Sequence, residues 1–130
     1  MKILFLVDQL HKCGGLERVL SHKLNFLHKN QPEIEITICT NEQQNKDYFF
    51  DIPQAIHCID LSVNYRHDIS LYSFENLKKT IPHYLKLKKI TNELQPDAIV
   101  HCGFGYDFYF LPLIAENNIK LIKENHSSRW

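Results

Sequence analysis

Short apolar segments of this chain alternate between two periodicities, and this alternation limits its fold more than any other feature. Residues 3–7 form a continuous apolar run that ends at Asp8, which is typical of a β-strand covered on both faces. In the next apolar segment, leucine and valine recur at the spacing of one face of an α-helix. Because such segments keep alternating, the sequence predicts an α/β fold with a parallel sheet.

The individual elements follow from the same two periods. Strands are predicted at residues 3–7, 34–40, 56–61, 98–101 and 119–123. Helices are predicted at residues 16–28, 73–94 and 106–116, with Pro82 expected either to kink the second helix or to mark its true start. In the first helix the buried stripe is predicted to be Leu16, Val19, Leu20, Leu24 and Leu27, and the other face Glu17, Arg18, Ser21, Asn25 and His28.

The connections between parallel strands determine the expected topology. Right-handed crossovers predict one open sheet with the strand order 3-2-1-4-5 and helices on both faces, which is a Rossmann-like arrangement. The chain has 130 residues, slightly fewer than a typical domain of about 150 residues. We therefore expect residues 1–130 to form a single Rossmann-like domain.

The composition argues against several classes of protein. Hydrophobic residues make up 44% of the chain, which indicates a globular rather than a disordered state. Fifteen basic and fifteen acidic side chains cancel, which argues against a nucleic-acid partner. The four cysteines form no CxxC pair, and no segment approaches the roughly 20 apolar residues of a membrane span. From the cysteines and the lack of a membrane span we expect a cytoplasmic chain with reduced thiols. His57 and His101 lack metal-ligand partners at a useful spacing, so we expect no metal.

Three loops are expected to meet where the winding of the sheet reverses, between its first and fourth strands. Ligands of open parallel sheets bind at this point, beyond the carboxyl ends of the strands. Gly14 and Gly15 follow the first strand, Gly103 and Gly105 follow the fourth, and His126 follows the fifth. The sequence therefore predicts one binding crevice formed by segments that lie far apart in the chain.

Two interpretations of Gly14 and Gly15 remain open at this stage. Glycines at the start of a helix let a phosphate or a sugar approach free backbone N–H groups, or they only permit a tight turn. A dinucleotide-binding loop requires G-x-G-x-x-G, and the run from Cys13 to Arg18 lacks this spacing. Glu42 follows the second strand and imitates the acid that binds a ribose, but acids are common in polar loops. Nicotinamide chemistry is the weaker hypothesis.

The segments that carry these residues resemble a known family. Residues 1–7 and the run Gly14-Gly15-Leu16-Glu17-Arg18-Val19 resemble the opening of a GT-B-fold glycosyltransferase of the retaining family 4, also called "group 1". Residues 95–101 are similar to the fourth strand of that family. Residues 121–126 are similar to the next strand, which ends in a histidine. The resemblance covers nearly the whole chain.

The resemblance implies two Rossmann-like domains that face each other across a cleft, with this chain on the acceptor side. It places Gly14 and Gly15 near the donor diphosphate and the acceptor, includes Glu17 and Arg18 in the same element, and places His126 near the transferred sugar. The implied substrates are a nucleotide-sugar donor and a glycan or lipid-linked acceptor, with no metal or other cofactor.

Relative to that family, the donor-binding C-terminal domain is absent from this sequence. Glu116 and Glu124 have the eight-position spacing of the family's glutamate pair, but they fall in the wrong domain. We expect residues 1–130 to fold, to transfer no sugar alone and to self-associate through an uncovered sheet edge. The alternative is a self-contained Rossmann-like or flavodoxin-like nucleotide-binding module without catalysis.

One segment combines basic and apolar side chains. Residues 74–94 contain five lysines against two glutamates, with apolar side chains between them. The lysines are Lys78, Lys79, Lys86, Lys88 and Lys89. Such a helix can bind anionic lipid at the inner face of a membrane, or it can be an ordinary crossover helix with a solvated lysine face.

Overall fold

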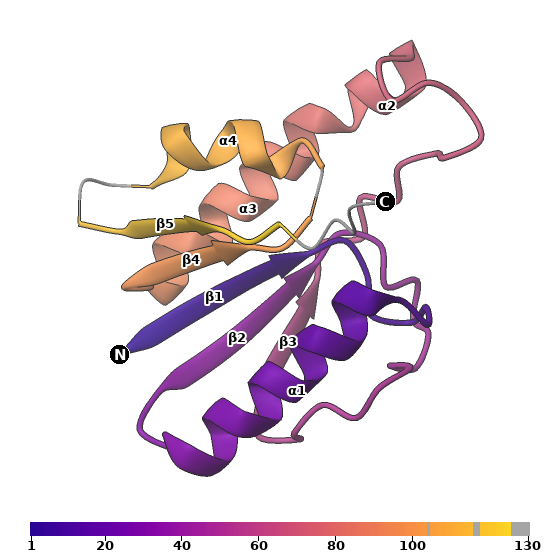
Figure 1. Ribbon diagram of the computed structural model, residues 1–130. Coiled ribbons are helices and arrows are strands. Elements are labelled where there is room, and N and C mark those ends of the chain that lie inside the picture. Colours follow the sequence, from indigo (N-terminus) through magenta and orange to yellow (C-terminus); the bar gives the residue numbers. More distant parts are fainter. Residues whose placement is uncertain (104, 116–117, 126–130) are drawn as a thin grey trace.

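The sheet has the topology that the sequence predicts. The computed structural model describes residues 1–103, 105–115 and 118–125, and in it five parallel strands form one open, Rossmann-like sheet in the order β3-β2-β1-β4-β5 (Figure 1). The elements are β1 (Lys2–Val7), α1 (Gly15–Asn30), β2 (Glu35–Thr40), β3 (His57–Asp60), α2 (Phe74–Lys78), α3 (Thr80–Leu94), β4 (Ala98–His101), α4 (Asp107–Ile114) and β5 (Lys120–Lys123).

Helices cover both faces of the sheet, and β1 supplies side chains to both cores. Alternate residues of a strand point to opposite faces. Leu4 and Leu6 pack in the same cluster as Leu87 of α3, whereas Phe5 and Val7 pack in the same cluster as Leu24 of α1. The continuous apolar run at residues 3–7 is therefore explained by a central strand that is buried on both sides.

The buried face of α1 differs from the predicted stripe. Leu20 and Leu24 are buried as expected, but Val19 is 42% exposed, and Glu17 and Ser21 are buried. Glu17 and Ser21 can be buried because both have polar partners. The Glu17 carboxylate accepts a hydrogen bond from the Gln9 amide, and the Ser21 hydroxyl donates to a backbone carbonyl at 2.6 Å. Hydrophobic periodicity alone misses such partners.

The segment predicted as one helix over residues 73–94 is two helices. Ser73 caps α2, as its hydroxyl oxygen accepts from the backbone N–H of Asn76. Pro82 lies in the first turn of α3, which begins at Thr80, so the alternative that a helix starts near Pro82 agrees with the structure to within two residues. Proline has no N–H to donate to the carbonyl of Lys78, the residue at which α2 ends.

None of the helices in the described parts of the chain is long and apolar enough to cross a membrane.

The two faces of α1 can be compared by truncating one side chain on each. We predict that Leu24→Ala lowers the free energy of unfolding by about 2–5 kcal/mol, because it leaves a cavity against the sheet. Val19→Ala is expected to change it by less than about 0.5 kcal/mol, since that side chain contacts solvent. Urea unfolding followed by circular dichroism measures both values, and equal losses would contradict the observed orientation of α1.

Candidate functional site

Three connections are joined at the carboxyl edge of the sheet, where the strand order reverses between β1 and β4. Asp8 directly follows β1, and its backbone carbonyl accepts from the N–H groups of Asn41 and Glu42 at 3.1 and 3.0 Å. The Cys102 N–H, just after β4, donates to the carbonyl of Leu6 in β1 at 2.8 Å. The loops that follow β1, β2 and β4 are thereby fixed relative to one another.

A chain of polar side chains lies at this edge, and three of them, Asn41, His101 and Asp107, are buried. The side-chain amide nitrogen of Asn41 lies 3.2 Å from a carboxylate oxygen of Asp8 and 3.2 Å from one of Asp107, so one amide bridges two acids. The other oxygen of Asp107 lies 2.8 Å from Nε2 of His101. Nδ1 of His101 lies 2.7 Å from the ammonium nitrogen of Lys123, which fixes the ring proton on Nε2.

The two bridged carboxylates have opposite proton affinities. Burial and the nearby charge of Asp107 raise the pKa of Asp8 above its ordinary value. Burial also acts to raise the pKa of Asp107, but the hydrogen bond from His101 and the other electrostatic interactions of this carboxylate outweigh burial and lower that pKa. Ionisation of Asp8 therefore destabilises the folded state, whereas ionisation of Asp107 stabilises it.

A pocket of about 340 Å³ opens beside this cluster. Glu42 is only 6% exposed and lies 2.8 Å, by both carboxylate oxygens, from Nε2 of His67. The guanidinium of Arg66 is already paired with Asp68 and Glu75. The pocket is lined by Asp8, Asn41, Glu42, Tyr65, Arg66, His67, Ile69, Leu71 and Gly105. Asp8 and Glu42 give the lining two carboxylates, which suit hydroxyl or cationic ligand groups better than phosphates.

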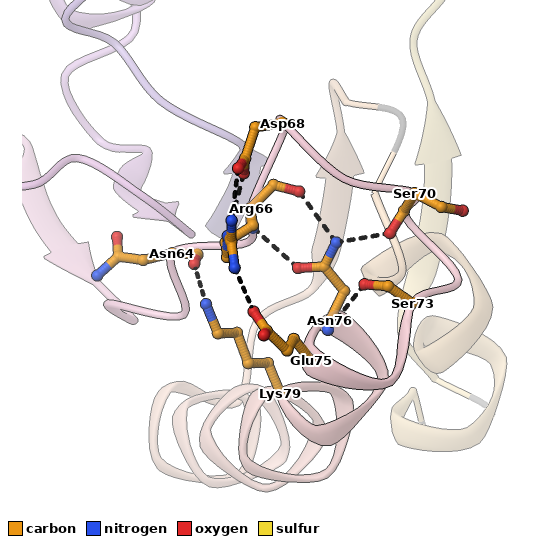
Figure 2. A network of polar contacts seen from close by, with 8 residues as sticks. All are labelled: Asn64, Arg66, Asp68, Ser70, Ser73, Glu75, Asn76 and Lys79. Carbon is orange, nitrogen blue, oxygen red and sulfur yellow. Dashed lines mark hydrogen bonds and ion pairs between the residues drawn. The ribbon is translucent and has the colours of Figure 1, made fainter.

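The outer wall of the pocket is a loop that Asn76 holds in shape (Figure 2). The side-chain oxygen of Asn76 accepts from the backbone N–H of Arg66 at 2.8 Å. Its amide nitrogen donates to the carbonyls of Arg66 and Ser70 at 2.9 and 3.0 Å. Because Asn76 is fully buried in the first turn of α2, the position of this wall depends on that helix.

The four glycines predicted at the site do not owe their presence to backbone conformation, since none has a positive φ. A Cβ at Gly14 would collide with the Glu17 carboxylate, and a Cβ at Gly103 or Gly105 would lie 3.0 to 3.3 Å from Asp8. Carboxylates of Glu17, Asp8 and Asp107 therefore occupy the space beside three of the four glycines. The proximity to Asp8 also confirms that Gly103 and Gly105 lie at the end of β1.

Gly15 is different. It is the first residue of α1 and is exposed, and a Cβ there would meet nothing within 4 Å. The fold therefore gives no reason for a glycine at this position, which leaves the backbone open to an approaching ligand. Arg18 is exposed in the same turn, and His126 lies outside the described residues.

Sequence reasoning missed Asp8, Asn41, Asp107 and the role of His101 in this cluster. Asp8 and Asn41 could have been found, because each is a polar residue that directly follows a strand ending at the carboxyl edge. Nothing in the sequence shows that Asp107 and Asn41, which are 66 positions apart, share a hydrogen bond. Within the described ranges no group of three His, Cys, Asp or Glu side chains is arranged to hold a metal ion.

Comparison with known proteins identifies no family for this chain. No protein-family model matches the sequence, and no curated protein matches it significantly. The functional assignment therefore rests on the geometry of the site and on the sequence resemblance.

The opposite proton affinities of the two carboxylates predict opposite effects of the same substitution. Asp8→Asn should raise the free energy of unfolding at neutral pH by about 0.5–2 kcal/mol, because it removes a buried charge while keeping an acceptor for Asn41. Asp107→Asn should lower it by about 1.5–3 kcal/mol, because it removes the charge-assisted hydrogen bond with the buried His101.

The pH dependence of the stability change in Asp8→Asn tests whether the pKa of Asp8 is raised on folding. The pKa of Asp8 is raised on folding, so the benefit of Asp8→Asn should shrink as the pH falls toward the ordinary aspartate value of about 3.9. Urea unfolding of both variants over this pH range measures the effect. A loss of stability in Asp8→Asn at neutral pH would show that the charge of Asp8 stabilises the fold.

Proposed function

We propose that this chain is the acceptor-side part of a retaining glycosyltransferase, which moves a sugar from a nucleotide-sugar donor to a glycan or lipid-linked acceptor. The observation that carries the proposal is the open backbone of Gly15 at the start of α1, on the ligand-binding edge of a Rossmann-like sheet. The resemblance of residues 14–19 to the glycine-containing element of family 4 supports the same assignment.

The chemistry of the pocket favours an acceptor. Sugar hydroxyl groups donate hydrogen bonds, and Asp8 and Glu42 offer carboxylate oxygens to accept them. Tyr65, Ile69 and Leu71 add apolar surface, which suits the carbon face of a sugar ring. A pocket of about 340 Å³ has the size of a small-ligand site.

The same charges disfavour the alternative of a self-contained nucleotide-binding module. The carboxylates of Asp8 and Glu42 repel a phosphate in the pocket, and the Glu17 carboxylate lies against Gly14 at the start of α1. Donor phosphates then require positive charge from elsewhere, which a second domain would supply.

The edge of the sheet also fits a part that packs against more protein. Every residue of β5 is exposed, and Leu121 and Ile122, whose side chains point to opposite faces, are 41% and 47% exposed. Apolar side chains on both faces of an edge strand favour a covering element. We propose that the rest of the enzyme, including its donor-binding domain, covers this edge.

A substitution at Gly15 separates ligand binding from folding. In the enzyme that contains both proposed domains, Gly15→Val should lower kcat/KM for sugar transfer by about a hundredfold, because the side chain fills the space through which substrate reaches the backbone. The free energy of unfolding should not fall, since φ is not positive at this residue and no atom lies nearby. A radiolabelled-sugar transfer assay and urea unfolding measure the two effects.

His28→Val is the matched control, because His28 is an exposed residue near the other end of α1, and it should leave kcat/KM unchanged. Residues 1–130 alone should show no transfer. Transfer by residues 1–130 alone would overturn the two-domain assignment. An unchanged kcat/KM in Gly15→Val would remove the role of this glycine, and tight nucleotide binding by a complete protein without transferase activity would support the alternative module.

A further inference from the structure

The outer side of α2 and α3 carries four apolar side chains that are largely exposed. Phe74, Leu77, Ile81 and Leu85 are 75%, 43%, 69% and 58% exposed. Phe74 and Leu77 are three residues apart in α2, and Ile81 and Leu85 are four residues apart in α3, so each pair lies on one side of its helix. We call these four residues the outer stripe. Figure 1 shows that α2 projects beyond the end of the sheet.

The inner side of the same helices already forms the hydrophobic core. Asn76, His83, Leu87 and Thr91 are buried there, and Leu87 packs with residues of β1 and β4. A surface helix normally presents polar residues on the side away from the core. Apolar residues on the outer side therefore indicate a second contact surface rather than a part of the fold.

The five lysines of this segment divide into two groups in the structure. Lys78, Lys88 and Lys89 are exposed, and the ammonium of Lys78 lies 5.1 Å from the ring centre of Phe74 in the outer stripe. Lys86 instead donates to the carbonyl of Leu61 at 2.7 Å, and Lys79 donates to the carbonyl of Asn64. The ammonium of Lys88 lies 5.9 Å from the ring centre of Tyr84, and that of Lys89 lies 4.0 Å from the carboxylate of Glu93. Three of the five lysines thus stay exposed on these helices, and two bond to the loop that follows β3.

We propose that the outer stripe, together with Lys78, Lys88 and Lys89, binds the surface of an anionic lipid bilayer. The apolar side chains enter the interfacial region, and the ammonium groups pair with lipid phosphates. A second copy of the chain fits less well, because a symmetric contact through this face would bring the lysines of both copies together. This inference is independent of the sugar-transfer proposal, since it uses no residue of the pocket.

Vesicle sedimentation tests the proposal with the chain as it stands. The chain should sediment with vesicles of equal parts phosphatidylcholine and phosphatidylglycerol but not with phosphatidylcholine alone, and added salt should weaken the binding. Ile81→Ser and Leu85→Ser should each lower the partition coefficient about tenfold, because each removes an apolar side chain that enters the bilayer interface. Lys78→Gln, Lys88→Gln and Lys89→Gln together should weaken it about a hundredfold.

Matched controls lie on α1, on the opposite face of the sheet. Phe26 is 62% exposed and Lys29 is exposed, so Phe26→Ser and Lys29→Gln should leave vesicle binding unchanged. Circular dichroism checks that each variant is folded. The proposal is overturned if the chain ignores anionic vesicles or if the α1 variants weaken binding as much as the α3 variants. It is also overturned if the chain is a dimer by sedimentation velocity that Ile81→Ser converts to a monomer.

Discussion

The parallel pairing of β1 with both β2 and β4 is the constraint on which the rest of the structure depends. It sends three strand ends to the same edge of the sheet, where Asn41 bridges the carboxylates of Asp8 and Asp107. Two carboxylates that share one amide donor repel each other, and the hydrogen bonds from that amide only partly offset the repulsion. A fold selected for stability alone would not collect them, which makes this edge the natural place for chemistry.

Periodicity predicted the elements of this fold well because it records which faces are buried. Residues 98–101 form β4 as predicted, and the two-residue alternation at residues 34–40 corresponds to β2. It failed where polar groups are buried in pairs, as with Glu17 against Gln9, because a period assigns every charge to solvent. Periodicity missed the Asp107–His101 pair for the same reason. These two side chains come together only because of the loop that follows β4.

The four glycines differ in their surroundings and not in the sign of φ, since none adopts a left-handed conformation. Three of them give room to carboxylates, and only Gly15 leaves its backbone open without a structural reason. The acidic pocket and the outer stripe share no residue, although the loop that walls the pocket is held by Asn76 of α2.

The central physical claim is that Asp8 and Asp107 form one coupled pair with opposite proton affinities. Carbon-13 NMR of the aspartate carboxyl groups, recorded over a pH titration, tests this most directly. The structure predicts that Asp8 titrates above the ordinary value of about 3.9 and that Asp107 titrates below it. If both carboxyl groups titrate at the ordinary value, or if Asp107 titrates above Asp8, the proposed cluster at the sheet edge does not exist.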